Sequence, residues 1–256
     1  AIKANFKPRT MYKDVTARDV ETVPEVDLYV AGFPCQPFST AGKQQGFQDK
    51  KGRGTIFFHL VEYIKRKQPK VFILENVKGL VTLKGGHYMK TILKILESIP
   101  DSRGLLSSTE LNDAQRCAAG DGRFLYNIHW KVLDTQDHGV PHCRSRWCCV
   151  GIREDCDRGS FVFPTGIECP KIEHFIDSNV GEDTVDYGTL AKSNIDRAHR
   201  KIKSDGGDPS AETYVVDIDA ASNRWKYIKG KSPCITRSRY RGHYMTNFRR
   251  RFTLSE

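Results

Sequence analysis

Two short apolar runs indicate the fold: VDLYVA at residues 26–31, which ends at a glycine, and KVFIL at residues 70–74. Each run has the length of a strand and lies between turn-forming residues, so each predicts a buried strand. Between them, apolar residues recur at helical spacing over residues 56–64, followed by three basic residues and Pro69. Basic residues favour a helix C-terminus and proline ends a helix, so a strand–helix–strand unit is expected.

The same alternation continues further along the chain. Residues 89–99 have the apolar spacing of an amphipathic helix, and residues 126–133 and 146–152 have the pattern of strands. Alternating strands and helices predict an α/β fold. We expect an open, largely parallel, Rossmann-like sheet with helices on both faces.

The chain divides into regions of different character. The polar passage 101–123, rich in Ser, Asp and Gly, is expected to be a surface insertion. The alternation stops near residue 163, so residues 1–163 are expected to form the core domain. Residues 164–250 are more polar and less regular, which predicts a smaller, irregular recognition lobe, and residues 251–256 are expected to return to the core.

A basic tract accounts for the whole excess of positive charge. The formal net charge is +10, and the ten Lys and Arg residues between Arg224 and Arg251 occur with no Asp or Glu among them. Aromatic residues are interleaved with these charges, a combination suited to contacts with nucleic-acid phosphates and bases. Arg237, Arg239 and Arg241 are candidates for contacts with base edges, with phosphate contact as the alternative. A solvated basic face is the structural alternative for the tract as a whole.

The eight cysteines are scattered along the chain, and 38% of the residues are hydrophobic. The chain therefore has enough apolar residues to fold without disulfides, which favours reduced thiols inside a cell. Four cysteines near two histidines have no paired metal-ligand spacing, and we interpret them as structural thiols rather than a metal site: Cys143, Cys148, Cys149, Cys156, His138 and His142. No apolar run is long enough to span a bilayer.

A thiol and a carboxyl group are expected at the same edge of the sheet. Cys35 follows the first strand closely, and Glu75 comes directly after the second. In open α/β sheets, functional residues gather beyond the carboxyl ends of the strands. This placement predicts one site containing both groups, although a single loop cysteine is more often inert.

Six segments in order resemble the motifs of C5-cytosine-specific DNA methyltransferases. They are DVT at 14–16, GFPCQPFS at 32–39 followed by GKQ at 42–44, RGTIFF at 53–58, ENV at 75–77, QDHGVP at 136–141 followed by RSR at 144–146, and RFTLSE at 251–256. This resemblance implies an enzyme, a DNA (cytosine-5-)-methyltransferase. It would methylate double-stranded DNA in an epigenetic or a restriction-modification setting.

The resemblance implies roles for four catalytic residues. Cys35 would add as a thiolate to C6 of cytosine, which makes C5 enamine-like and reactive. Glu75 would hold N3 and N4 of the base and favour protonation at N3. Arg146 would contact O2 and orient Glu75, and Arg144 would support the cysteine loop. Because the two arginines are two residues apart in a strand-like segment, they are expected to point to the same side; a surface salt bridge is the alternative.

The implied methyl donor is S-adenosylmethionine. Asp14 and Val15 would lie near its adenine and Ile56 beside the cofactor, with Pro34 stiffening the adjoining loop. The family's glycine-rich first motif would precede residue 1, and its last motif would follow Glu256. We therefore expect a catalytic-domain fragment that binds the cofactor poorly, and inactivity of the fragment is one alternative.

The target base is stacked inside duplex DNA, so the cytosine would have to be flipped out. The resemblance implies that Gln36, Ser39 and Lys43 close over the flipped nucleotide, and Asn76 is grouped with these DNA contacts. His142 stands where the family usually has Gln. An enzyme acting on DNA would lie inside the cell, in the nucleus of a eukaryote or otherwise in the cytoplasm or nucleoid.

Three other functions fit some of these features. A transfer-RNA cytosine methyltransferase would use the same catalytic groups. A catalytically silent protein could keep the basic tract and bind DNA only. A nucleotide methylase similar to thymidylate synthase also attacks C6 of a pyrimidine with a cysteine, but the ENV and RSR segments and the basic tract disfavour it.

Overall fold

The computed structural model describes residues 2–38, 45–50, 52–101, 124–239, 241–253 and 256. They form two compact units, one of residues 1–132 and 146–163, the other of residues 133–145 and 164–256. The chain enters the second unit at Leu133, returns to the first at Arg146 and passes to the second again at Pro164. The expected insertion at 101–123 lies outside the described residues, apart from Asp101.

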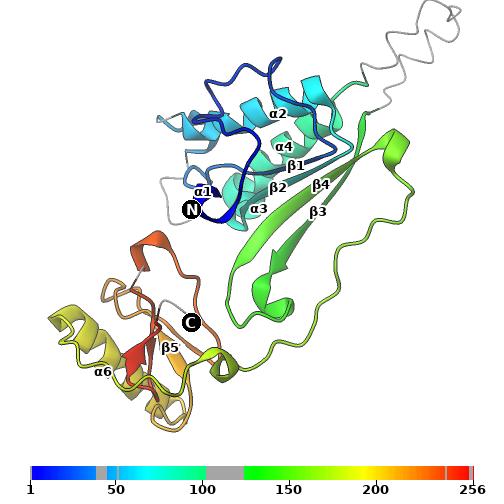
Figure 1. Cartoon of the computed structure of the whole chain (residues 1–256). Helices are drawn as coiled ribbons and strands as arrows, with labels where there is room; N and C mark the ends of the chain where they lie inside the picture. The colour runs from blue at the N-terminus through cyan, green and yellow to red at the C-terminus, as the bar shows by residue number, and fades with distance from the viewer. Residues whose placement is uncertain (1, 39–44, 51, 102–123, 240, 254–255) are drawn as a thin grey trace, which may run out of the picture. The chain divides into compact units, whose positions relative to one another are not determined.

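The first unit is built on a four-stranded sheet in the order β1-β2-β4-β3 (Figure 1). Its strands are β1 (Leu28–Gly32), β2 (Val71–Val77), β3 (Tyr126–Asp134) and β4 (Ser145–Arg153). The α/β class is confirmed. Strand β1 pairs with β2 in parallel, whereas β2 and β4 are antiparallel, so the described sheet is mixed rather than largely parallel. An apolar pattern carries no strand direction, which is why the sequence did not reveal the reversal.

Helices α2 (Ile56–Lys67), α3 (Gly79–Thr82) and α4 (His87–Glu97) share one core with the sheet. They pack against the face that carries Phe72 and Leu74, both fully buried. The prediction that β1 is buried was wrong for its other face, because Leu28 is 53% and Val30 is 63% exposed. Both residues alternate with the half-buried Tyr29 and Ala31, which join the core.

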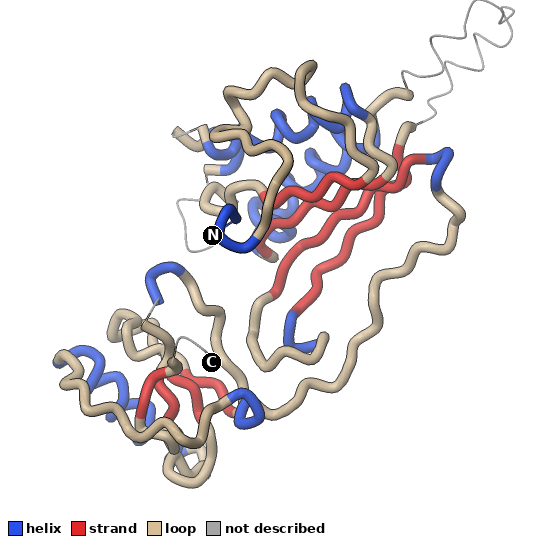
Figure 2. The backbone as a smooth tube through the Cα atoms, in the orientation of Figure 1, coloured by secondary structure: helices blue, strands red, loops and turns tan. Residues whose placement is uncertain are grey.

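The second unit contains helix α6 (Thr189–Ser204) and a second sheet in the order β6-β5-β7-β8 (Figure 2). The strands are β5 (Tyr214–Val216), β6 (Tyr227–Lys229), β7 (Tyr244–Met245) and β8 (Arg250–Arg251), and the neighbouring strands are antiparallel. The lobe is therefore more regular than predicted. Strands of two or three residues are too short to show a periodic pattern in the sequence.

The remaining described elements are short. They are α1 (Ile2–Asn5) and 3₁₀ turns at 46–48, 53–55, 83–86, 135–137, 154–156, 172–175 and 237–239. Among the described residues, no helix combines the length and the apolar composition that crossing a bilayer requires.

Among the C-terminal residues that the structure describes, residues 251–253 and Glu256 group with the second unit, and the expected return of residues 251–256 to the core stays a prediction. The side chain of Arg250 is buried, and it donates hydrogen bonds of 2.8 and 2.7 Å to the carboxylate of Glu256. A buried guanidinium requires such a partner, because leaving it unpaired would be strongly destabilising. These hydrogen bonds lower the pKa of Glu256 to about 2.

Gly151 of β4 lies against the ring of Phe72, and a Cβ at this position would come within 2.2 Å of the ring. We expect Gly151→Ala to lower the free energy of unfolding by about 1–3 kcal/mol, since Phe72 has no room to move within the core. Chemical denaturation of the full-length protein measures this change. Gly181→Ala is the control, because a Cβ there meets nothing within 4 Å, and an equal loss of stability in both variants would contradict the packing argument.

Candidate active site

Cys35 lies in the turn that follows β1 and is half-buried with a free thiol. Its carbonyl oxygen accepts a hydrogen bond of 2.9 Å from the backbone N–H of Phe38. The rings of Phe33 and Phe38 are buried on either side of the cysteine and contact each other edge to face. The turn is thus anchored to the core at both ends, while the thiol between the anchors is left partly accessible.

Glu75 lies beside the start of this turn. In the parallel pairing of β1 and β2, Gly32 is directly opposite Glu75. An added Cβ on Gly32 would be 3.1 Å from Oε2 of Glu75, so a larger residue would crowd the carboxylate. Sequence analysis placed Glu75 just beyond its strand, but β2 continues to Val77 and Glu75 is still within it.

Arg146 of β4 forms an ion pair with Glu75, with Nε 2.6 Å from Oε1. The antiparallel pairing places Arg146 opposite Val77, so the arginine reaches Glu75 from the neighbouring strand. Both side chains stay partly exposed. The ion pair holds one carboxylate oxygen of Glu75, and the catalytic role of Arg146 stays a prediction.

Asn76 of β2 connects its strand to the residue that follows β1. Its side chain is fully buried, Nδ2 donates a hydrogen bond of 3.2 Å to the carbonyl oxygen of Phe33, and Oδ1 accepts one of 2.8 Å from the N–H of Val77. Asn76 was predicted to be among the DNA contacts, and the structure contradicts this, because a fully buried amide bonded within the protein does not reach DNA. We reassign it as a residue that positions the Cys35 turn. Its place on the buried face with Phe72 and Leu74 was the signal that could have revealed this role.

We expect Asn76→Ala to lower the free energy of unfolding by about 1–3 kcal/mol, since it leaves a buried carbonyl oxygen without its donor. Turnover should fall as well, because the turn that carries Cys35 loses its attachment to β2. Urea denaturation and methylation rates of the full-length protein measure both effects. Asn127→Ala removes an exposed 2.7 Å hydrogen bond to Asp157 and serves as control, and equal effects of the two substitutions would refute the role of Asn76.

The turn between β3 and β4 holds Arg144 by its backbone. The carboxylate of Asp134 accepts hydrogen bonds from the N–H groups of Arg144 (3.1 Å) and Gln136 (3.3 Å) and from the hydroxyl of Ser145. Burial raises the pKa of Asp134, but these hydrogen bonds outweigh it and the pKa lies below its usual value. Sequence analysis missed Asp134, although a carboxylate at the start of a turn is a common cap.

Arg144 itself precedes β4, which begins at Ser145. The prediction that the two arginines lie in one strand was therefore wrong. Its Nη1 lies 3.5 Å from Sγ of Cys234 in the second unit. His142 accepts a hydrogen bond of 3.1 Å at Nε2 from the N–H of Ile235. Support of the Cys35 turn by Arg144 stays a prediction.

The residues predicted to bind the cofactor lie in the first unit. Val15 and Ile56 are apolar, half-buried and packed against the core, so each leaves part of an apolar surface accessible. Asp14 is exposed, and hydrogen bonds from the N–H and hydroxyl of Thr16, both 2.8 Å, lower the pKa of its carboxyl group. Accessible apolar side chains and an ionised carboxylate fit an adenosyl group. Pro34 is half-buried beside Cys35.

Three cysteines lie in β4 or just before it. Burial raises the pKa of Cys149 to about 12, and burial also raises the pKa of Cys148 and of Cys143. These thiols stay protonated at neutral pH, as expected of structural cysteines. In the part of the chain that the structure describes, no group of three or more His, Cys, Asp or Glu residues is arranged to hold a metal ion.

The predicted DNA contacts are only partly described. Gln36 is exposed next to Cys35, whereas Ser39 and Lys43 lie outside the described residues, as does the side chain of Arg237. Arg239 forms an ion pair with Asp217, and Arg241 is exposed. Direct contact of any of these residues with DNA stays a prediction.

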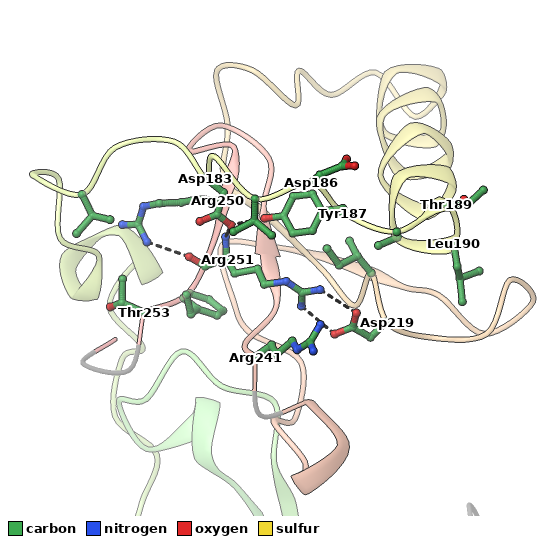
Figure 3. Close-up of a pocket in the computed structure, with 16 residues that line it drawn as sticks. Asp183, Asp186, Tyr187, Thr189, Leu190, Asp219, Arg241, Arg250, Arg251 and Thr253 are labelled. Carbon is green, nitrogen blue, oxygen red and sulfur yellow. Dashed lines mark hydrogen bonds and ion pairs between the residues drawn. The ribbon is translucent and has the colours of Figure 1, made fainter.

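A pocket of about 900 Å³ lies in the second unit and is lined by residues of that unit (Figure 3). Arg251 donates two hydrogen bonds of 2.8 Å to the carboxylate of Asp219, which lowers the pKa of Asp219, and Arg241 lies beside this pair. The charges that line the pocket are thus largely matched. Cys35, Glu75, Arg144 and Arg146 are not among the lining residues, so the pocket is distinct from the predicted catalytic site.

Comparisons with known proteins identify the family. The model of the family described as C-5 cytosine-specific DNA methylase matches residues 2–100 and 102–252. The chain is 36% identical over 165 residues to the Type II methyltransferase M.NgoBI of Neisseria gonorrhoeae, an alignment that covers 64% of this chain and 42% of the relative. It is 33% identical over 205 residues to M1.ScrFI of Lactococcus lactis subsp. cremoris, covering 79% of this chain and 44% of the relative.

Among solved structures, the chain is similar to a methyltransferase of Entamoeba histolytica, EhMeth, with 16% identity and a TM-score of 0.48 over 77% of this chain and 52% of that one. The matched part spans less than half the length of the curated relatives named above. Since the family model covers nearly all of residues 2–252, the chain belongs to the C-5 cytosine-specific DNA methylase family.

Proposed function

We propose that the protein transfers a methyl group from S-adenosylmethionine to C5 of a cytosine in double-stranded DNA, through a covalent bond between Cys35 and C6. The observation that carries this proposal is the carboxylate of Glu75, held by Arg146 at 2.6 Å and paired in register with the glycine that opens the Cys35 turn. A nucleophile and an oriented carboxylate at one strand edge fit attack on a base that is gripped by its hydrogen-bonding edge.

The chemical steps follow one another in a set order. The Cys35 thiolate forms a bond to C6, the electron pair of the C5–C6 double bond shifts to the C4–C5 bond, and that of the C4–N3 double bond shifts to N3, where Glu75 favours protonation. Arg146 keeps Glu75 aimed at N3 and N4 and contacts O2. S-adenosylmethionine, when bound near Asp14, Val15 and Ile56, supplies the methyl group to C5. Loss of the C5 proton to a base then breaks the bond between sulfur and C6 and restores the aromatic ring.

Cytosine inside a duplex is stacked, so the base must rotate out before Cys35 reaches C6. Gln36 lies next to Cys35 and is exposed, which suits a contact with the displaced strand. The basic tract of residues 224–251 would neutralise phosphates of the duplex. A protein with this activity works where DNA is, inside the cell.

Methylation assays with the full-length protein test the proposal and its nearest alternative together. Labelled S-adenosylmethionine is supplied with either duplex DNA or transfer RNA, and the product base is identified after digestion. We expect 5-methylcytosine in DNA only. Label in transfer RNA alone would favour the RNA enzyme, and binding of DNA with no label in either substrate would favour the silent DNA-binding protein.

A further inference from the structure

Asp217 occupies a rigid position in the second unit. It directly follows β5, whose three residues are all buried, and its backbone N–H donates a hydrogen bond of 3.1 Å to the carbonyl oxygen of Lys226. Its carboxylate therefore projects from the central part of the small sheet and not from a loose loop. Groups carried by such elements hold their direction more accurately than groups on loops.

Arg239 is held against this carboxylate. Its Nε lies 2.5 Å from Oδ1 of Asp217, and its Nη1 donates a hydrogen bond of 3.2 Å to the hydroxyl of Ser238. The backbone is fixed as well, because the N–H of Arg239 donates to Thr236 at 2.8 Å and its carbonyl oxygen accepts from Gly242 at 3.0 Å. The side chain of Arg239 is 22% exposed, so it is held in place without being fully enclosed.

His243 lies next to the pair formed by Asp217 and Arg239. Its ring is buried, and Nδ1 lies 3.9 Å from the same oxygen of Asp217. Burial is the main reason that the pKa of His243 falls below its usual value, although Asp217 raises it in part. The imidazole is therefore uncharged near neutral pH, and the charge of Asp217 remains directed at Arg239.

Other arginines of the basic tract are arranged differently. Arg249 is 62% exposed, with a 3.5 Å ion pair to Glu182 that is also exposed. Arg250 and Arg251 are bound to Glu256 and Asp219 inside the unit. A flexible, solvated arginine suits phosphates, which need charge but little geometry, whereas an arginine fixed before binding suits a base edge, because little side-chain entropy remains to be lost.

We propose that Arg239 is a specificity-determining residue that reads a guanine in the major groove, with Asp217 as the residue that positions it. Arginine donates two parallel hydrogen bonds to O6 and N7 of guanine, a pattern that no other base offers in that groove. The inference rests on the proposed function, since it names one base of the DNA substrate.

The test uses the full-length protein and a pool of duplexes in which a cytosine is flanked by random sequence. Bound duplexes and methylated duplexes are sequenced separately, so base preference is measured even without methylation. We expect one position at which the wild-type protein prefers guanine by roughly 10- to 100-fold. In Arg239→Lys the charge remains but the planar fork is lost, so this preference should fall markedly while the other positions and overall binding change little.

Two further variants and a modified base make the result specific. Asp217→Asn should weaken the guanine preference and leave the other base preferences unchanged. Arg200→Lys makes the same exchange at an exposed residue of α6 and should leave every base preference unchanged. Replacing that guanine by 7-deazaguanine should weaken binding of the duplex by the wild-type protein and leave binding by the Arg239→Lys variant unchanged. A uniform loss over all sequences in Arg239→Lys, an unchanged preference, or a wild-type protein with no guanine preference would overturn the inference. Guanine preference in bound duplexes without any methylation would instead refute the proposed function and leave this inference standing.

Discussion

Glu75→Gln should slow methylation of duplex DNA by about 10²- to 10⁴-fold, the range expected when a positioned acid–base group is removed. The amide keeps the size of the carboxylate, and its oxygen can still accept a hydrogen bond from Arg146. In the wild-type protein Nε of Arg146 lies 2.6 Å from Oε1 of Glu75. The negative charge that favours protonation at N3 is lost, so the barrier to attack at C6 rises. Folding should be nearly unchanged, since both side chains are partly exposed and a surface ion pair contributes little to stability.

Single-turnover rates at saturating cofactor measure this effect apart from binding. Glu62→Gln is a matched control, because Glu62 is also a glutamate paired with an arginine, Arg66 at 2.8 Å, but on the exposed side of α2. The control should keep its full rate. Near-normal turnover in Glu75→Gln would refute the role of this carboxylate.

Cys35→Ser should reduce turnover by on the order of 10⁴-fold or more, the largest effect that we expect of any substitution. A serine hydroxyl is a far weaker nucleophile than a thiolate, and Cys35 alone is placed in the turn opened by the glycine opposite Glu75. Binding of duplex DNA should remain, because the basic tract is untouched. Cys156→Ser, at another half-buried free cysteine of the same unit, should keep nearly full activity. A Cys35→Ser protein that still turns over at a substantial rate would show that the attack uses another group.

The sequence predicted the elements that have long patterns. The helix over 56–67 and the strands near 71, 126 and 146 were predictable because their apolar spacing repeats over five or more residues. The antiparallel pairing of β2 with β4 was not, since strand direction depends on connections and not on the pattern. The second sheet was missed because its strands are only two or three residues long.

The site was predictable as far as motifs name its residues. The contact between Glu75 and Arg146 was expected from the resemblance, and the structure contains it. The burial of Asn76, the support of the β3–β4 turn by Asp134 and the fixation of Arg239 by Asp217 were not foreseen. Each depends on residues far apart in the sequence or on the direction of a side chain, which a single sequence does not report.

The central claim is that sulfur at position 35 becomes bonded to the target base. A duplex carrying 5-fluorocytosine blocks release of the base after methyl transfer, because the fluorine cannot leave as a proton does. Incubated with such duplexes and S-adenosylmethionine, the full-length protein should form an adduct that survives denaturation, and mass spectrometry should locate it on Cys35. No adduct with the wild-type protein, or an adduct that persists in Cys35→Ser, would contradict the account.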